Sequence, residues 1–250
     1  MLFSREMKVL ILIAGFGTRL YPLTENISKA FIEVGGKKII DHIMEKLDSC
    51  KDISDIFLIT NNLFFEAFCE WDKQSSFTKK IRIINNLTNG PEERLGAVGD
   101  MAFVIERIGL EEDIIIIGGD TLFGFGVEES IAFFKGKNTS VVAGKAVEDK
   151  SLLATRFGVI EVGEGNKIVG FEDKPKIPKT NIGSLCYYIL KKEDLSLVLQ
   201  CVKEGNKDHS GDLIEFMFKR TLLHSFVFES EWFDVTNQDI LRSAEKFYSK

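Results

Sequence analysis

MKVLILIAGFGTRLYPLT, residues 7–24, joins a mostly apolar run to a turn that carries two glycines and an arginine. The apolar run, Met7–Ala14, is typical of a parallel strand that is buried on both faces of a sheet. The turn has the order Gly15-Phe16-Gly17-Thr18-Arg19 and directly follows the carboxyl end of that strand. Ligands of open α/β sheets bind beyond the carboxyl ends of the strands, so this turn is a candidate ligand site.

Strands and helices are predicted to alternate through the first 150 residues. Further strands are expected at 55–60, 81–84, 113–117 and 139–143, and helices at 39–47, 63–71, 98–108 and 128–134. This β-α-β-α order predicts the α/β class, with a Rossmann-like, doubly wound sheet and right-handed crossovers.

The later part of the chain is richer in predicted strands. Strands are expected at 158–162, 167–171, 185–190, 225–228 and 232–235, and helices at 194–202, 212–222 and 237–248. The sequence Gly163-Glu164-Gly165-Asn166 between the first two of these strands is a hairpin signal. We interpret this part as a β-region inserted into a mixed sheet, and the whole chain, 1–250, as a single domain.

Composition and charge argue against several classes of protein. A net charge of −6 disfavours a nucleic-acid binder, because a phosphate backbone requires a basic surface, although a nucleotide can occupy a local basic pocket. The four cysteines include no CxxC pair, which predicts reduced thiols rather than a zinc site or a disulfide framework. The N-terminal apolar run is too short for a signal peptide or a membrane span. We therefore expect a cytoplasmic protein with no membrane partner, in an oligomeric state that the sequence leaves open.

The glycine turn and a nearby lysine are candidates for binding phosphate. Glycines let backbone N–H groups approach an anion closely, and Arg19 adds a bidentate donor. A dinucleotide fingerprint would need a third glycine where Leu20 stands, and a Walker A loop would need Gly-Lys-Ser/Thr. A tight turn with a solvated arginine is the structural alternative. Lys29 is either a surface lysine or a second cation for the same anion.

One aspartate is a candidate for binding a metal ion, and a second aspartate late in the chain is also singled out. Asp120 follows the apolar run IIIIGG at the carboxyl edge of the predicted sheet, where a carboxylate suits Mg²⁺, and the alternative is a Gly-Gly-Asp turn. Asp234 ends a short aromatic strand, and its alternative role is to cap the last helix. Lys174 leaves the predicted hairpin among mixed charges, which is usually a solvated face.

The order of these motifs resembles the signature of the sugar-1-phosphate nucleotidyltransferases, which include glucose-1-phosphate thymidylyltransferases and uridylyltransferases. The resemblance covers nearly the whole chain, in the family's order and with similar spacings. It rests on LIAGFGTRL at 12–20 with Pro22-Leu23-Thr24 and Lys29, then Leu95-Gly96-Ala97, Gly119-Asp120, FGVIEV at 157–162, GFEDKPKIPKTN at 170–181, and Trp232-Phe233-Asp234.

The resemblance implies a Mg²⁺-dependent enzyme. Its reaction would join a nucleoside monophosphate from a nucleoside triphosphate, dTTP or UTP, to a sugar 1-phosphate such as glucose 1-phosphate, and release pyrophosphate. Residues 1–150 would mainly bind the nucleotide, and residues 151–250 would mainly bind the sugar phosphate and supply a closing helix. Displacement at phosphorus needs positioning and charge neutralisation, and the attacking phosphate oxygen is already ionised, so no catalytic histidine is expected.

The resemblance also implies a role for each matching residue. Arg19 and Lys29 would be catalytic, with Arg19 stabilising the departing pyrophosphate and Lys29 contacting the reacting phosphate. Nucleotide binding is implied for Ala14, Gly15, Gly17, Thr18 and Gly96, metal binding for Asp120 and Asp234, and sugar-phosphate binding for Gly158, Asp173, Lys174 and Asn181.

Departures from the family pattern keep the substrates open. Ser28 replaces a proline, Thr121 an asparagine and Cys186 a glycine, while residues 235–237 and His209 also differ. Most of these changes concern the sugar side. Uracil or thymine would suit an asparagine or a backbone edge, whereas a glutamate at 92 or 93 would suit the amino group of cytosine. The alternatives are a cytidylyltransferase acting on a sugar phosphate or a phosphocholine-like phosphate, and a non-catalytic nucleotide-binding regulatory protein.

Overall fold

A computed structural model describes residues 6–206 and 208–249. These residues form two compact units, each built from segments that are distant in the sequence. The first unit contains residues 6–95, 117–127 and 231–249, and the second contains residues 96–116, 128–206 and 208–230. The predicted assignment of nucleotide and sugar phosphate to 1–150 and 151–250 concerns ligands, and it stays a prediction.

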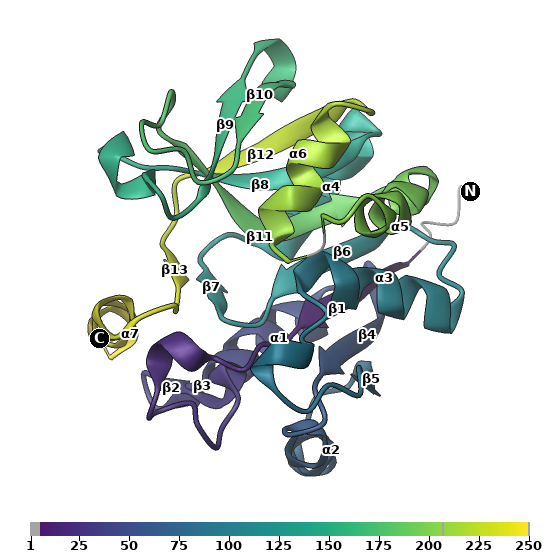
Figure 1. The fold of residues 1–250 in the computed structure, drawn as a ribbon, viewed down its shortest axis with the longest axis vertical. Helices are drawn as coiled ribbons and strands as arrows, with labels where there is room; N and C mark the ends of the chain where they lie inside the picture. The colour runs from purple at the N-terminus through teal and green to yellow at the C-terminus, as the bar shows by residue number, and fades with distance from the viewer. Residues whose placement is uncertain (1–5, 207, 250) are drawn as a thin grey trace. The chain divides into compact units, whose positions relative to one another are not determined.

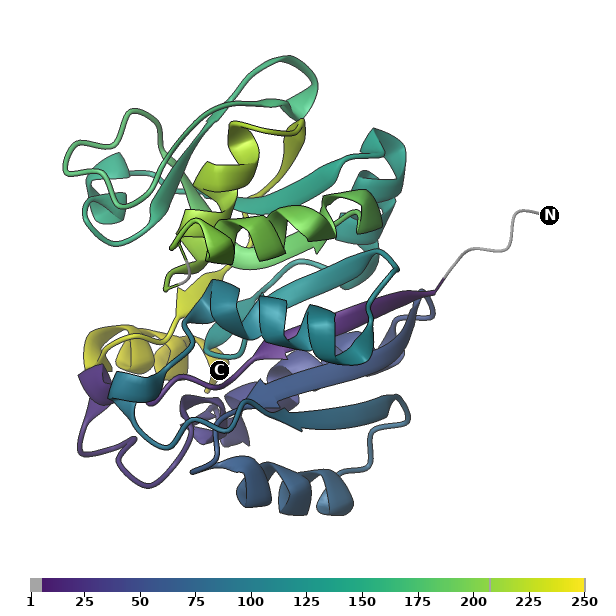
Figure 2. The ribbon, with the colours of Figure 1, turned by 45° about the vertical axis from the view of Figure 1, so that its right-hand side comes forward.

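Three parallel strands form the centre of the first unit. Strand β1 (Met7–Leu12) pairs with β4 (Ile53–Thr60), and β4 pairs in turn with β5 (Lys80–Asn85), as Figure 1 shows. The helices that follow are α1 (Ile39–Ser49) and α2 (Phe65–Gln74), and α2 packs against β5 (Figure 2). The inner strands β1 and β4 are rich in buried Val, Leu and Ile, as expected for parallel strands covered on both faces. The alternation of strands and helices predicted from the sequence is confirmed in this unit.

The first unit also contains two short two-stranded pairs and the last helix. The hairpin of β2 (Glu33–Val34) with β3 (Lys37–Lys38) was not predicted, nor was β7 (Thr121–Phe123), which pairs with β13 (Trp232–Asp234). Helix α7 runs over Gln238–Tyr248. Its N-cap is Asn237, whose side-chain oxygen accepts the N–H groups of residues 239 and 240, so Asp234 is not the cap. Short 3-10 helices lie at Thr18–Leu20, Lys29–Phe31 and Pro91–Glu93.

The strands of the second unit are mostly antiparallel. Strand β8 (Ser140–Ala146) pairs antiparallel with β11 (Ile182–Leu190) and parallel with β12 (Leu223–Phe228). Strand β11 also pairs with β9 (Gly158–Val162), which forms the predicted hairpin with β10 (Ile168–Glu172). The expected combination of parallel and antiparallel strands in an α/β protein is therefore confirmed.

Helices of the second unit pack on one another and on its strands. Helix α3 (Ala97–Ile108) lies against α5 (Leu195–Lys203) and α6 (Ser210–Phe218), as Figure 2 shows for α3 and α5. Helix α6 ends four residues before the predicted end at Leu222, because the chain turns there and enters β12 at Leu223. The remaining elements are α4 (Val127–Lys137), β6 (Ile114–Gly118), which runs on into the first unit, and 3-10 helices at Lys150–Leu153, Glu164–Asn166 and Lys192–Asp194.

No disulfide bond joins the four cysteines, all of which lie among the described residues. Among residues 6–206 and 208–249 we find no helix with the length and apolarity that a membrane span requires.

Candidate active site

The glycine loop after β1 is held in place by two fully buried side chains. Asn61 Nδ2 donates to the carbonyl oxygen of Ala14 at 3.0 Å, and Thr24 Oγ1 donates to the carbonyl oxygen of Gly17 at 2.7 Å. Asn61 Oδ1 in turn accepts the N–H of Phe64 at 3.1 Å. Sequence reasoning assigned no role to Asn61 or Thr24, although Asn61 directly follows the end of a buried strand, where polar residues often serve a site.

The unpaired N–H groups of the loop indicate an anion-binding site. In the described part of the chain, no group accepts a hydrogen bond from the backbone N–H of Gly15, Phe16, Gly17 or Thr18. Backbone N–H groups in proteins are nearly always paired with protein, solvent or ligand. Gly17 has a φ of +67°, and successive N–H groups at such a turn form anion-binding sites. The loop therefore has donors suited to phosphate oxygens, and its role in binding a nucleotide stays a prediction.

Lys29 and Asp120 meet next to this loop. Lys29 Nζ lies 2.7 Å from Asp120 Oδ2, and the two side chains are 15% and 26% exposed. The Cγ atom of Lys29 would lie only 3.2 Å from a Cβ placed on Gly17, so its stem runs along the loop. Gly119 donates its N–H to the carbonyl oxygen of Leu12 at 3.0 Å. A Cβ on Gly119 would collide with the side chain of Ile13. The missing Cβ lets the segment before Asp120 approach β1 closely.

Strand pairing brings Asp234 close to Asp120 along the backbone. Asp234 lies opposite Thr121 in the β7–β13 pair, and Val235 donates its N–H to the carbonyl oxygen of Asp120 at 2.9 Å. A carboxylate directly before β7 and one at the end of β13 are a donor set that suits Mg²⁺, which binds one or two carboxylates and completes its coordination with phosphate and water. No group of three or more His, Cys, Asp or Glu side chains among the described residues could hold an ion alone, so substrate oxygens would be needed as ligands.

Arg19 lies in the 3-10 helix that ends the loop. Its side chain is exposed, and it forms no ion pair or hydrogen bond with the described residues. An unpaired guanidinium beside a turn of unpaired N–H groups is suited to bidentate binding of phosphate. Its catalytic role stays a prediction.

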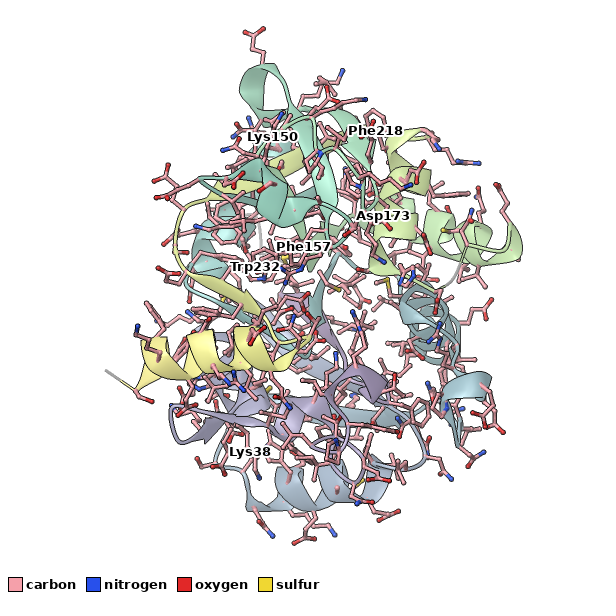
Figure 3. All side chains as sticks on the ribbon, turned by 60° about the vertical axis from the view of Figure 1, so that its left-hand side comes forward. Lys38, Lys150, Phe157, Asp173, Phe218 and Trp232 are labelled. Carbon is pink, nitrogen blue, oxygen red and sulfur yellow. The ribbon has the colours of Figure 1, made fainter. Side chains whose placement is uncertain are left out.

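Asp173 and Lys174 follow β10 in the second unit. Lys174 has a φ of +47° and donates its N–H to the carbonyl oxygen of Phe157, and its ammonium lies 3.8 Å from the carboxylate of Asp173. Figure 3 labels Asp173 and Phe157. Asp173 also packs against Gly211, where a Cβ would collide with its carboxylate. Burial raises the pKa of Asp173, and the charge of Lys174 offsets part of that rise.

The other predicted ligand residues of the second unit have structural explanations. A Cβ on Gly158 would lie 2.6 Å from the ring of Phe171, so glycine is needed for packing. Asn181 donates its side-chain N–H to the carbonyl oxygen of Val147 at 2.7 Å and accepts the N–H of Val147 on its backbone at 2.9 Å. Gly96 has a φ of +83° and precedes α3. Their predicted roles in binding sugar phosphate or nucleotide stay predictions.

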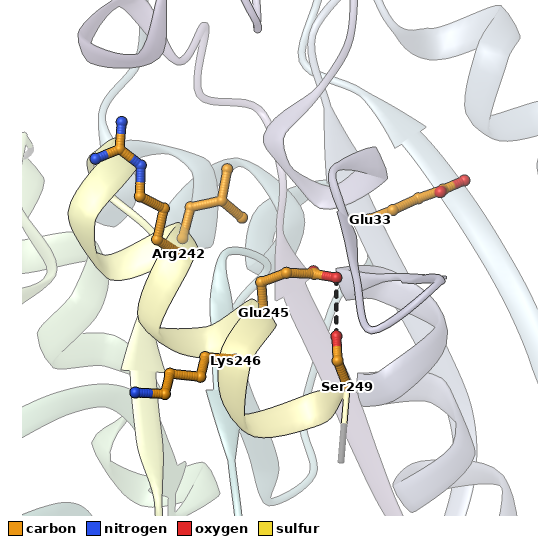
Figure 4. A pocket seen from close by; sticks show the side chains of 6 residues that line it. Glu33, Arg242, Glu245, Lys246 and Ser249 are labelled. Carbon is orange, nitrogen blue, oxygen red and sulfur yellow. Dashed lines mark hydrogen bonds between the residues drawn. The ribbon is translucent and has the colours of Figure 1, made fainter.

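An open hollow of about 420 Å³ lies along α7 and contains none of the predicted site residues. Figure 4 shows its lining side chains, which come from Glu33, Leu241, Arg242, Glu245, Lys246 and Ser249. Glu245 is already engaged, since it accepts the N–H of Gly35 at 2.8 Å and the hydroxyl of Ser249 at 3.1 Å. We interpret the hollow as the surface where α7 meets the β2–β3 hairpin, and not as the ligand site.

Comparison with known proteins identifies the family of the chain. The family described as "Nucleotidyl transferase" matches residues 8–250. The chain is 28% identical over 247 residues to the bifunctional protein GlmU of Methanocaldococcus jannaschii, with 96% of this chain and 54% of the relative covered. It is 26% identical to a putative mannose-1-phosphate guanyltransferase of Sulfolobus acidocaldarius, with 92% and 59% covered. The chain thus spans little more than half the length of these curated relatives.

Solved structures share the fold at low sequence identity. A putative glucose-1-phosphate thymidylyltransferase from Bacillus anthracis, in complex with a sucrose, has a TM-score of 0.84 at 24% identity, with 98% of this chain and 96% of that chain covered. A UDP-glucose pyrophosphorylase complexed with UDP-glucose has a TM-score of 0.79 at 17% identity, with 97% and 98% covered. At these identities the similarity demonstrates the fold alone, which matches the predicted α/β class.

Proposed function

The chain belongs to the nucleotidyl transferase family, and on that premise we propose that it transfers a nucleoside monophosphate from a nucleoside triphosphate to a sugar 1-phosphate. The observation that carries the proposal is the grouping, within the first unit, of unpaired loop N–H groups with Lys29 and Asp120. Such a group of donors and charges suits a triphosphate and the displacement of pyrophosphate from it.

In the proposed reaction an oxygen of the acceptor phosphate forms a bond to the α-phosphorus of the triphosphate. The bond between that phosphorus and the bridging oxygen of the β-phosphate breaks, and pyrophosphate leaves with the electron pair. The attacking oxygen is ionised at neutral pH, so no side chain has to remove a proton. The work of the protein is to align the two phosphates and to neutralise their charges.

Each candidate site residue of the first unit has a role in this scheme. The N–H groups of the loop bind the triphosphate, and the buried anchors Asn61 and Thr24 keep the loop from reorganising. Arg19 neutralises charge on the leaving pyrophosphate, and Lys29 neutralises the phosphate at which the bond forms. Asp120 and Asp234 would hold Mg²⁺, which supplies further neutralisation of the triphosphate when it is bound.

Residues of the second unit are proposed to bind the acceptor. Lys174 would bind its phosphate, with Asp173 holding the ammonium in position at 3.8 Å. Gly158 and Asn181 are proposed to line the sugar pocket. We favour dTTP or UTP and glucose 1-phosphate. The names of the relatives support a sugar phosphate but not one base, since they include a guanyltransferase and a glucose-1-phosphate adenylyltransferase.

Mass spectrometry of reaction products tests the proposal. The full chain is incubated with Mg²⁺ and each of dTTP, UTP, CTP, ATP and GTP, together with glucose 1-phosphate, mannose 1-phosphate, N-acetylglucosamine 1-phosphate or phosphocholine. A nucleotide-sugar product supports the proposal and identifies base and sugar. A product formed only from CTP and phosphocholine would replace the sugar acceptor by a choline-type one. Triphosphate binding without a product from any pair would favour a regulatory protein and contradict the proposed reaction.

A further inference from the structure

The carboxylate proposed to bind the metal ion is already neutralised by a lysine. Asp120 Oδ2 accepts a hydrogen bond from Lys29 Nζ at 2.7 Å, and the two side chains form an ion pair that is largely shielded from solvent. A divalent cation at the same oxygen would repel the ammonium at a few ångströms, and this repulsion is strong where water is partly excluded. Lys29 and a metal ion therefore compete for Asp120.

The lysine has a second position within reach. Its stem runs beside Gly17, whose loop has unpaired N–H groups on the neighbouring residues. The lysine side chain has four rotatable carbons and ends in a compact charge, so its ammonium can turn about this stem toward an anion in the loop. Thr24 and Asn61 fix the loop itself, so movement falls on the lysine.

We propose that Lys29 is a displaceable occupant of the metal site, which a triphosphate in the loop draws away from Asp120. This inference rests on the proposed function for the identity of the anion. It makes metal and triphosphate binding cooperative, because each ligand favours the same position of Lys29. The nucleotide-free protein consequently binds a divalent cation weakly, and the metal site becomes available when the triphosphate is bound.

Titration of the nucleotide-free protein with Mn²⁺ alone, followed by electron paramagnetic resonance of the free ion, tests the competition. Lys29→Met removes the competing charge and should tighten Mn²⁺ binding by about tenfold, and Lys29→Gln should do the same. Lys29→Arg keeps the charge and should bind Mn²⁺ as weakly as the wild type. Lys37→Met is the matched control, because Lys37 also pairs with a carboxylate in the first unit, Glu45 at 2.6 Å, and this change should leave Mn²⁺ affinity unaltered.

A double variant identifies the carboxylate. Adding Asp120→Asn to Lys29→Met should abolish the gain in affinity. The inference is overturned if both uncharged variants bind Mn²⁺ no more tightly than the wild type, or if the gain survives in the double variant. The titration uses neither nucleotide nor sugar and measures no turnover, so its failure is distinguishable from failure of the proposed nucleotidyl transfer.

Discussion

Gly17 shows how one residue shapes the candidate site. Its φ of +67° is unfavourable for a side chain, and a Cβ would lie 2.9 Å from the Cβ of Thr24. We predict that Gly17→Ala lowers the free energy of unfolding by about 1–2 kcal/mol, because it forces a left-handed alanine against a buried side chain. It should also weaken binding of inorganic triphosphate by about tenfold or more, since displaced N–H groups lose charge-assisted hydrogen bonds. Urea unfolding and calorimetry measure the two effects.

Gly36→Ala separates backbone strain from the site. Gly36 also has a positive φ, of +75°, but a Cβ there would meet no atom within 4 Å. The variant should lose about 1 kcal/mol of stability and keep the triphosphate affinity of the wild type. Equal loss of affinity in the two alanine variants would show that the loop has no special part in binding.

Asp173 provides a test by pH. Burial raises its pKa above the ordinary 3.8, so the folded protein binds this proton more tightly than the unfolded chain. Ionisation of Asp173 therefore costs stability as the pH rises from 3.8 through the raised pKa. We predict that Asp173→Asn improves stability relative to the wild type more at pH 7 than at pH 4, as measured by urea unfolding at both values. A difference that stays constant with pH would contradict the assigned cause.

At the scale of elements, α7 is fastened to the β2–β3 hairpin by a carboxylate. Glu245 accepts the N–H of Gly35 at 2.8 Å. Gly35 packs closely on α7, since a Cβ on Gly35 would lie 2.7 Å from Tyr248. Glu245→Ala should lower the free energy of unfolding by about 1 kcal/mol, although alanine is the better helix former. Glu33→Ala, which changes a carboxylate in the same hollow, should alter it by less than about 0.5 kcal/mol. Equal effects in urea unfolding would refute the role of this hydrogen bond.

The elements that sequence predicted well are those with long apolar patterns. β6 is a run of buried isoleucines and most of β4 is apolar and buried, so their apolar sequences located both strands to within two residues. β2, β3 and β7 have only two or three residues, too few for a periodic signal, and they depend on partners elsewhere in the chain. The sequence offered Asp234 as a cap for α7 and placed Asn237 inside the helix, whereas the structure shows that Asn237 is the cap.

For the whole molecule, sequence predicted the fold class and the family but only part of the site. The order of motifs predicted Lys29, Asp120 and Asp234 as site residues, and the structure brings these three segments together in the first unit, while their roles stay predictions. The sequence alone could not predict the Lys29–Asp120 ion pair. These residues are far apart in the sequence, and their contact depends on the packing of Gly119 against β1. The anchoring roles of Asn61 and of Thr24, which the motif contains, were missed because a buried polar side chain reveals its partner only in three dimensions.

The most direct test of the central claim is pyrophosphate release by Asp120→Asn, with the substrates that the product analysis identifies. The account predicts a fall in turnover of about 100-fold or more, in a variant that still unfolds cooperatively in urea. Asp55→Asn is the control, because Asp55 also pairs with a cation of the first unit, Arg82 at 3.2 Å, and it should retain wild-type turnover. Wild-type turnover in Asp120→Asn would contradict the claim that this carboxylate belongs to the catalytic site.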